Sequence, residues 1–153
     1  MTLRVVARLV VAAATLTAVA AVPVTALADA TTTMTIVVGD PITLQNKLLV
    51  TVPITITCPA PLAAGFMPGF VNVTVEQANG KSVSHGSGGV SLVACDATPQ
   101  SFLVQVTPDI LPVASPAFHK GSAILMANSE ICDNNFPQTC FFGSVGWVTV
   151  KLA

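Results

Sequence analysis

Four cysteines carry the clearest chemical signal in this chain of 153 residues: Cys58, Cys95, Cys132 and Cys140. No two of them have the C-x-x-C spacing of a zinc site, and neither histidine lies at the spacing that would complete one. An even number of cysteines in an exported chain is typical of disulfides. Three pairings can form. We favour Cys58 with Cys95 and Cys132 with Cys140, the second of which closes a short loop.

His85 and His119 are the residues that a hydrolase would use as a base. A serine hydrolase also places a serine and a carboxylate beside its histidine. The chain has no G-x-S-x-G motif, and its acidic residues are scattered rather than paired as in glycoside cleavage. The glycine-rich segment 86–89 lacks the lysine of a phosphate loop and predicts a hairpin turn. We therefore predict no enzyme activity and no cofactor, with a weak hydrolase using either histidine as an alternative.

Oxygen donors for a metal ion gather in one short segment. Glu130, Asp133, Asn134 and Asn135 offer the carboxylate and amide oxygens that Ca²⁺ prefers. Their spacing does not match an EF-hand loop. We predict no metal site, with calcium in this segment as the alternative.

The first 28 residues have the three parts of a secretory signal peptide. Arg4 and Arg8 form a basic start, residues 9–22 are apolar, and residues 26–28 read Ala-Leu-Ala. This arrangement predicts cleavage before Asp29. The apolar run is shorter than the roughly 20 residues of a spanning helix. We therefore expect a secreted, extracellular protein with no transmembrane segment after cleavage, made of one domain over 29–153.

Composition narrows the classes of function. Hydrophobic residues make up 52% of the chain and charged residues 8%, which excludes a disordered chain. Residues 29–153 hold four lysines, seven acidic residues and no arginine, so their formal charge is −3. A nucleic-acid partner needs a basic surface, and phosphate is usually bound by arginine. We exclude nucleic acid as a partner.

Period-two alternation of apolar and polar residues dominates residues 29–153. The best example is the segment 48–58, in which Val50, Val52, Ile54 and Ile56 alternate with threonines and Pro53. This pattern predicts a half-buried strand, with a bulge or a sheet edge at the proline. The full set of expected strands is 33–38 (continuing near 42–45), 48–58, 69–77, 81–85, 90–95, 100–107, 121–130 and 144–152.

Turn signals separate these strands, and Asn79-Gly80 is the strongest hairpin signal among them. Seven or eight short strands with such turns predict an all-β fold, a single immunoglobulin-like antiparallel β-sandwich with two disulfides. The chain resembles small secreted bacterial immunoglobulin-like domains, loosely including the neocarzinostatin-type apoproteins. The resemblance rests on the expected signal peptide, the valine- and threonine-rich strands, the two disulfides and the acidic charge. In that family both disulfide loops are short, whereas Cys58 and Cys95 would enclose a long one. The resemblance therefore implies the fold and does not imply a bound chromophore.

Apolar side chains occur where the sandwich requires loops. In an immunoglobulin-like fold the loops after 48–58 and after 121–130 share one end. The residues that would meet there are Phe66, Met67, Phe136, Phe141 and Phe142. An exposed apolar cluster of this size marks a contact site; the alternative is that these side chains cap the open end of the core. Trp147 is expected on the outer face of the last strand, either as a further contact or packed under Lys151.

We predict a secreted, non-enzymatic binding or cell-surface domain that uses this apolar loop end as its contact surface. The partner is an unknown protein or an apolar ligand. The alternative from another class is a carrier of an apolar small molecule in a cleft at the same end.

Overall fold

A computed structural model describes residues 33–62, 67–92, 95–110 and 114–153 of the chain. These residues form eight strands and no helix, so the predicted all-β class is confirmed. The segment 1–28, predicted to be a signal peptide, and Phe66 lie outside the described residues. The strands are β1 (Thr35–Val38), β2 (Thr43–Gln45), β3 (Leu49–Thr57), β4 (Met67–Asn79), β5 (Ser82–Leu92), β6 (Gln100–Pro108), β7 (Gly121–Cys132) and β8 (Cys140–Leu152).

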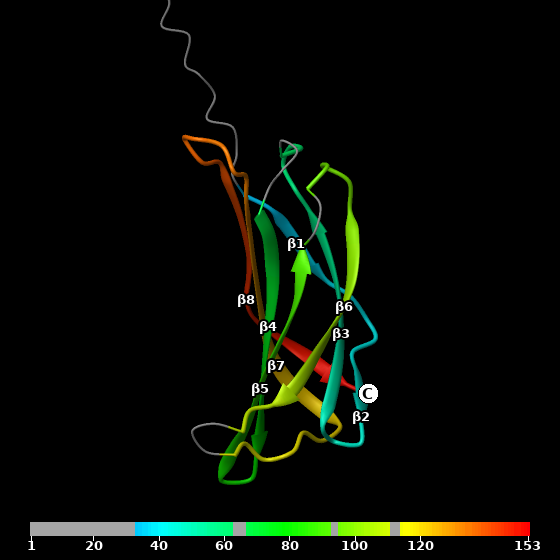
Figure 1. Cartoon of the computed structure of the whole chain (residues 1–153). Coiled ribbons are helices and arrows are strands. Elements are labelled where there is room, and N and C mark those ends of the chain that lie inside the picture. Colours follow the sequence, from blue (N-terminus) through cyan, green and yellow to red (C-terminus); the bar gives the residue numbers. More distant parts are fainter. Residues whose placement is uncertain (1–32, 63–66, 93–94, 111–113) are drawn as a thin grey trace, which may run out of the picture.

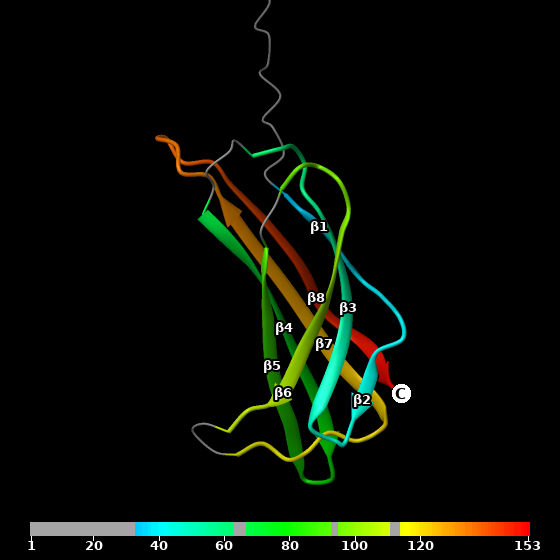
Figure 2. The same ribbon diagram turned by 45° about the vertical axis from the view of Figure 1, so that its right-hand side comes forward.

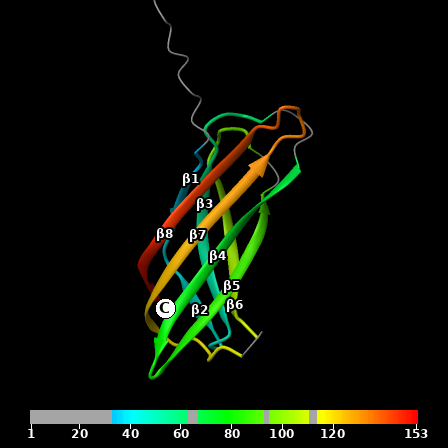
Figure 3. The same ribbon diagram turned by 90° about the vertical axis from the view of Figure 1, so that its left-hand side faces the viewer.

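The strands belong to one antiparallel hydrogen-bonded sheet in the order β1-β3-β6-β5-β4-β7-β8, with β2 also paired to β3. Strand β6 pairs with β3 over residues 100–106 and with β5 only at Thr107 and Pro108. The sheet curls until parallel bridges join Thr33 to Phe142 and Ile42 to Leu152, which makes it barrel-like. Figures 1 and 2 show this curl, and Figure 3 shows β8, β7, β4 and β5 side by side. The immunoglobulin-like sandwich remains a prediction.

Burial follows the predicted alternation. Along β3 the four residues Val50, Val52, Ile54 and Ile56 are buried, and every residue between them is partly exposed. Because side chains alternate between the two faces of a strand, one face of β3 forms core and the other meets solvent. The largest fully buried side chains are Phe118, Ile42, Ile54, Ile56, Leu92, Leu125, Ile131, Leu152, Val50, Val52, Val71 and Val73.

Pro53 lies where the strands beside β3 are interrupted. Strand β1 ends opposite Ile54 and β2 begins opposite Thr51. The Pro53 carbonyl accepts from the Gly39 amide on this side, and a residue of an antiparallel strand turns its N–H and C=O the same way. The missing N–H of proline therefore removes no bond to β6. The bulge or sheet edge expected at Pro53 was wrong, because β3 lies between β1 and β6 and keeps its register with β6 through this residue; the proline is accommodated at the gap between β1 and β2.

The glycine-rich segment 86–89 is not a turn, and this prediction was wrong. Residues 81–85 and 90–95 were expected as two strands, but β5 runs continuously from Ser82 to Leu92. The glycines are needed because β6 passes against this strand. A Cβ on Gly88 would lie 1.9 Å from the Gln105 carbonyl oxygen, and a Cβ on Gly86 would lie 2.4 Å from that of Thr107. The hairpin predicted from Asn79-Gly80 is confirmed; Asn79 pairs with Ser82, and Gly80, at φ +62°, and Lys81 form the turn between β4 and β5.

Both favoured disulfides are present, Cys58–Cys95 and Cys132–Cys140. The second joins directly opposed residues of β7 and β8 and closes the loop between them. In Figure 1 this loop (orange) projects from the end of the molecule opposite the β4–β5 hairpin. The two disulfides are consistent with an extracellular protein. No helix long and apolar enough to cross a membrane occurs in the described part of the chain.

Candidate functional site

Two exposed phenylalanines flank a carboxylate on the outer face of the sheet. Glu130 of β7 lies directly opposite Phe70 of β4 on one side and Phe142 of β8 on the other. Directly opposed residues share a face of the sheet, so the three side chains form one row across three strands. Phe70 is 42% exposed and Phe142 50%, and the two are roughly 10 Å apart at two strand spacings. We call these three residues the aromatic row.

A polar row lies beside the aromatic row on the same strands. Asn72, Asn128 and Ser144 are opposed across β4, β7 and β8 in the same way. A surface hollow of about 420 Å³ covers the area between the two rows. It is lined by Thr33, Phe70, Asn128, Ser129, Glu130, Phe142, Gly143 and Ser144. The hollow places two apolar rings, the Glu130 carboxylate and the Asn128 amide around one site, where a single ligand could contact them all.

The β7–β8 loop is held in shape by Asp133. Its Oδ1 accepts from the backbone amides of Thr139 (2.9 Å) and Asn135 (3.2 Å), and its Oδ2 accepts from the Asn135 side chain (3.0 Å). These bonds, that from the Thr139 amide above all, hold the pKa of Asp133 below its ordinary value because they stabilise the charged carboxylate. The Asp133 amide donates to the Thr139 carbonyl and closes the ring of contacts. Phe136 stands at the loop tip, 101% exposed.

The structure separates the residues that were expected to form the contact surface. Phe136 and Phe142 are exposed at one end of the molecule, whereas Phe141 is 5% exposed and belongs to the core. The expectation for Phe141 was wrong because β8 begins at Cys140, which turns Phe141 inward and Phe142 outward. Met67 begins β4 and pairs with Cys132. Trp147 is 48% exposed but stands five residues farther along β8 than Phe142, about 16 Å away.

Phe70 is the residue that the sequence analysis missed. The expected strand 69–77 already places Phe70 on the face opposite Val71 and Val73, with Asn72 and Thr74, so the signal was present. An apolar residue that faces outward from a strand indicates a contact surface as much as one in a loop does. Glu130 was considered only as a calcium ligand.

Of the oxygens considered for calcium, those of the Asp133 carboxylate are used within the protein. Both carboxylate oxygens of Asp133 accept hydrogen bonds from its own loop, so they face inward. Glu130, Cys132 and Cys140 also lie close together. Both sulfurs are joined in the disulfide and cannot act as thiolate ligands.

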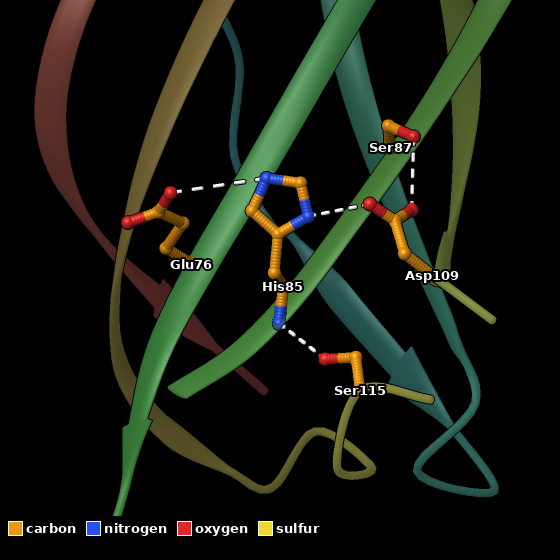
Figure 4. Close-up of polar contacts among 5 residues, drawn as sticks. All are labelled: Glu76, His85, Ser87, Asp109 and Ser115. Atoms are coloured by element: carbon orange, nitrogen blue, oxygen red, sulfur yellow. Dashed lines mark hydrogen bonds and ion pairs between the residues drawn. The ribbon is translucent and has the colours of Figure 1, made fainter. Parts of the chain in front are cut away.

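The two histidines occupy different polar settings. Figure 4 shows His85 between Asp109 and Glu76, with Nδ1 at 2.5 Å from Asp109 Oδ2 and Nε2 at 3.8 Å from Glu76 Oε1. Ser87 Oγ donates to the far oxygen of Asp109 (3.0 Å) and lies away from Nε2, so the serine does not stand where a triad nucleophile must. The ring nitrogens of His119 face the carbonyl oxygens of Ala78 and Lys120. This contact fastens the loop before β7.

Comparison with known proteins assigns no relative to this chain. No family model matches it, and neither a curated protein nor a solved structure does so. The functional argument therefore rests on the geometry of the surfaces described above.

Proposed function

We propose that the protein is an exported, non-enzymatic binding domain whose contact surface is the aromatic row together with Phe136. One observation carries this proposal: Phe70, Phe136 and Phe142 are exposed at one end of the molecule. Burial of a whole phenylalanine side chain contributes about 1.5–3 kcal/mol, so a partner that covers these rings gains several kcal/mol before the costs of association.

The carboxylate between the rings sets the chemistry of the partner. Among the described residues the ion pairs are those of His85 with Glu76 and Asp109, so Glu130 is paired with no cation. A wholly apolar ligand that bridged Phe70 and Phe142 would strip water from Glu130 without replacing it. A lysine or arginine side chain would instead pair with the carboxylate and lie against the rings as a cation. The aromatic row therefore favours a basic side chain flanked by apolar ones.

The surface is held in its binding shape in advance. Phe70 and Phe142 stand on strands whose backbone is paired through β7. Phe136 stands on a loop closed by a disulfide and by the contacts of Asp133. A surface that is ordered before binding loses less conformational entropy when the partner arrives. The formal charge of −3 on residues 29–153 also attracts a basic partner.

A peptide titration tests the proposal. The purified protein is titrated with two capped tripeptides, Leu-Arg-Leu and Leu-Glu-Leu, while backbone amide resonances are recorded by NMR. We expect the basic peptide to shift the amides around Phe70, Glu130 and Phe142, and the acidic peptide to leave them in place. The variants Phe142→Ser and Glu130→Gln should each weaken binding of the basic peptide.

The matched control is Leu103→Ser, because Leu103 is a 69% exposed apolar residue on β6, outside the aromatic row. This variant should bind as the unmodified protein does. Equal shifts with both peptides, or shifts that survive in Phe142→Ser and Glu130→Gln, would refute the proposal. If the protein instead carries an apolar small molecule, the opposite result is expected for Glu130→Gln. Removing the charge should then make an apolar fluorescent dye bind more tightly at the hollow.

A further inference from the structure

His85 lies between two carboxylates at the opposite end of the sheet from the disulfide loop. Its Nδ1 lies 2.5 Å from Asp109 Oδ2 and its Nε2 lies 3.8 Å from Glu76 Oε1. Glu76 and His85 are directly opposed on β4 and β5, and Asp109 follows the end of β6. The Asp109 backbone amide donates to the His85 carbonyl, and the His85 amide donates to Ser115 Oγ. Backbone contacts therefore fix the ring among its neighbours (Figure 4).

The contacts decide which nitrogen carries the proton. An ionised carboxylate only accepts hydrogen bonds, and Asp109 Oδ1 already accepts from Ser87 Oγ. Nδ1 must then be the donor to Asp109 Oδ2. The neutral ring therefore carries no proton on Nε2, the nitrogen nearer to Glu76. At 3.8 Å the two groups are too far apart for a hydrogen bond, and both are acceptors.

We propose that Glu76 and His85 bind a divalent transition-metal ion of the zinc or copper class between Oε1 and Nε2. Imidazole nitrogen and carboxylate oxygen are suitable ligands for these ions. Two ligands about 2.0–2.1 Å from a tetrahedral zinc ion lie roughly 3.4 Å apart, so Glu76 must move by only about 0.4 Å. Asp109 supplies the carboxylate that holds the other nitrogen of a metal-binding histidine in many such sites.

The position is open to a metal ion and its water ligands. The side chain of His85 is 43% exposed and that of Glu76 34%. A surface hollow of about 440 Å³ also borders Glu76, although His85 does not line it. Two protein ligands leave the remaining positions to water, so binding is weaker than at a closed site with four ligands. The ion would link β4 to β5 and, through Asp109, to the end of β6.

A competing occupant of the same gap is a proton, which would make His85 an imidazolium paired with both carboxylates. The metal and the proton exclude each other at Nε2 and are distinguished by experiment. Ca²⁺ and Mg²⁺ prefer oxygen ligands and serve as negative controls.

The test is isothermal titration of Zn²⁺ at pH 7.5 into protein purified after expression of all 153 residues, with the His ring resonances followed by NMR. We expect one Zn²⁺ per chain, with the ion on Nε2 of His85. Glu76→Gln keeps the His85–Asp109 contact, and His85→Ala removes the ring. Both should weaken binding at least tenfold, and Asp109→Asn should weaken it about 10–100-fold. The matched control His119→Ala should leave binding unchanged.

Thermal unfolding in the presence of a chelator establishes that each variant is folded. The proposal is overturned if Zn²⁺ fails to bind the folded protein, if His119→Ala abolishes binding while Glu76→Gln does not, or if Ca²⁺ competes equally. Since this site is separate from the aromatic row, Phe142→Ser should bind Zn²⁺ normally.

Discussion

Replacing Gly88 by alanine should separate β5 from β6. The added methyl carbon would lie 1.9 Å from the Gln105 carbonyl oxygen, 2.7 Å from its carbonyl carbon and 3.0 Å from Val106 Cα. All three atoms belong to backbone, so no side chain can rotate away. A carbon and an oxygen in ordinary contact are at least about 3.2 Å apart, so the two strands must separate by more than an ångström. A well-packed core is already destabilised by one extra methylene group, so this displacement is costly.

The expected cost is about 3 kcal/mol or more, at the upper end of what overpacking produces. For residues 29–153 this corresponds to a fall in melting temperature of roughly 10 °C. Denaturant unfolding followed by circular dichroism measures the change. Gly146→Ala is the matched control, because a Cβ at that position meets no atom within 4 Å, and its stability should change by less than about 0.5 kcal/mol. Similar stabilities for the two variants would refute the close passage of β6 over β5.

Three further outcomes are expected. Because the pKa of Asp133 is lowered in the folded protein, its contacts stabilise the loop at pH values above the ordinary carboxylate range, and this stabilisation is lost as the pH falls through the lowered pKa. Hydrogen exchange of the Thr139 amide should therefore accelerate only in that acid range. The variant Asp133→Ala should remove this pH dependence. Phe141→Ala should cost about 3–5 kcal/mol in denaturant unfolding while Phe136→Ala changes stability little, and equal effects would contradict the inward and outward assignment. Replacing both Cys58 and Cys95 by serine should lower the free energy of unfolding by about 4 kcal/mol, and replacing both Cys132 and Cys140 by about 2.5 kcal/mol, because the longer loop loses more entropy when it is closed. The reverse order in calorimetry would contradict this.

The strands of this protein were predictable wherever alternation was regular. In β3, valine and isoleucine occupy every second position, and the expected segment 48–58 differs from Leu49–Thr57 only at its ends. The disulfides were also predictable, because a short loop favours Cys132 with Cys140 and leaves one partner for Cys58. These features depend on local sequence.

The features that were missed depend on contacts between distant residues. Gly86 and Gly88 look like turn residues until β6 is seen to pass against them. Phe141 and Phe142 are adjacent and chemically identical, so only the starting point of β8 decides which is buried. Phe70 and Phe142 become neighbours of Glu130 only through the register of three strands.

The parallel bridges between the first and last strands have a consequence for the order of folding. Thr33 meets a residue 109 positions later in the chain, and Ile42 meets one 110 positions later. Contacts of such sequence separation form slowly, because the intervening chain must first be ordered. A chain that emerges from the ribosome N-terminus first exposes β1 and β2 long before β8 arrives. Until then the unpaired edge of β1 is open to other strands, so the interval before closure is when this protein is most exposed to aggregation.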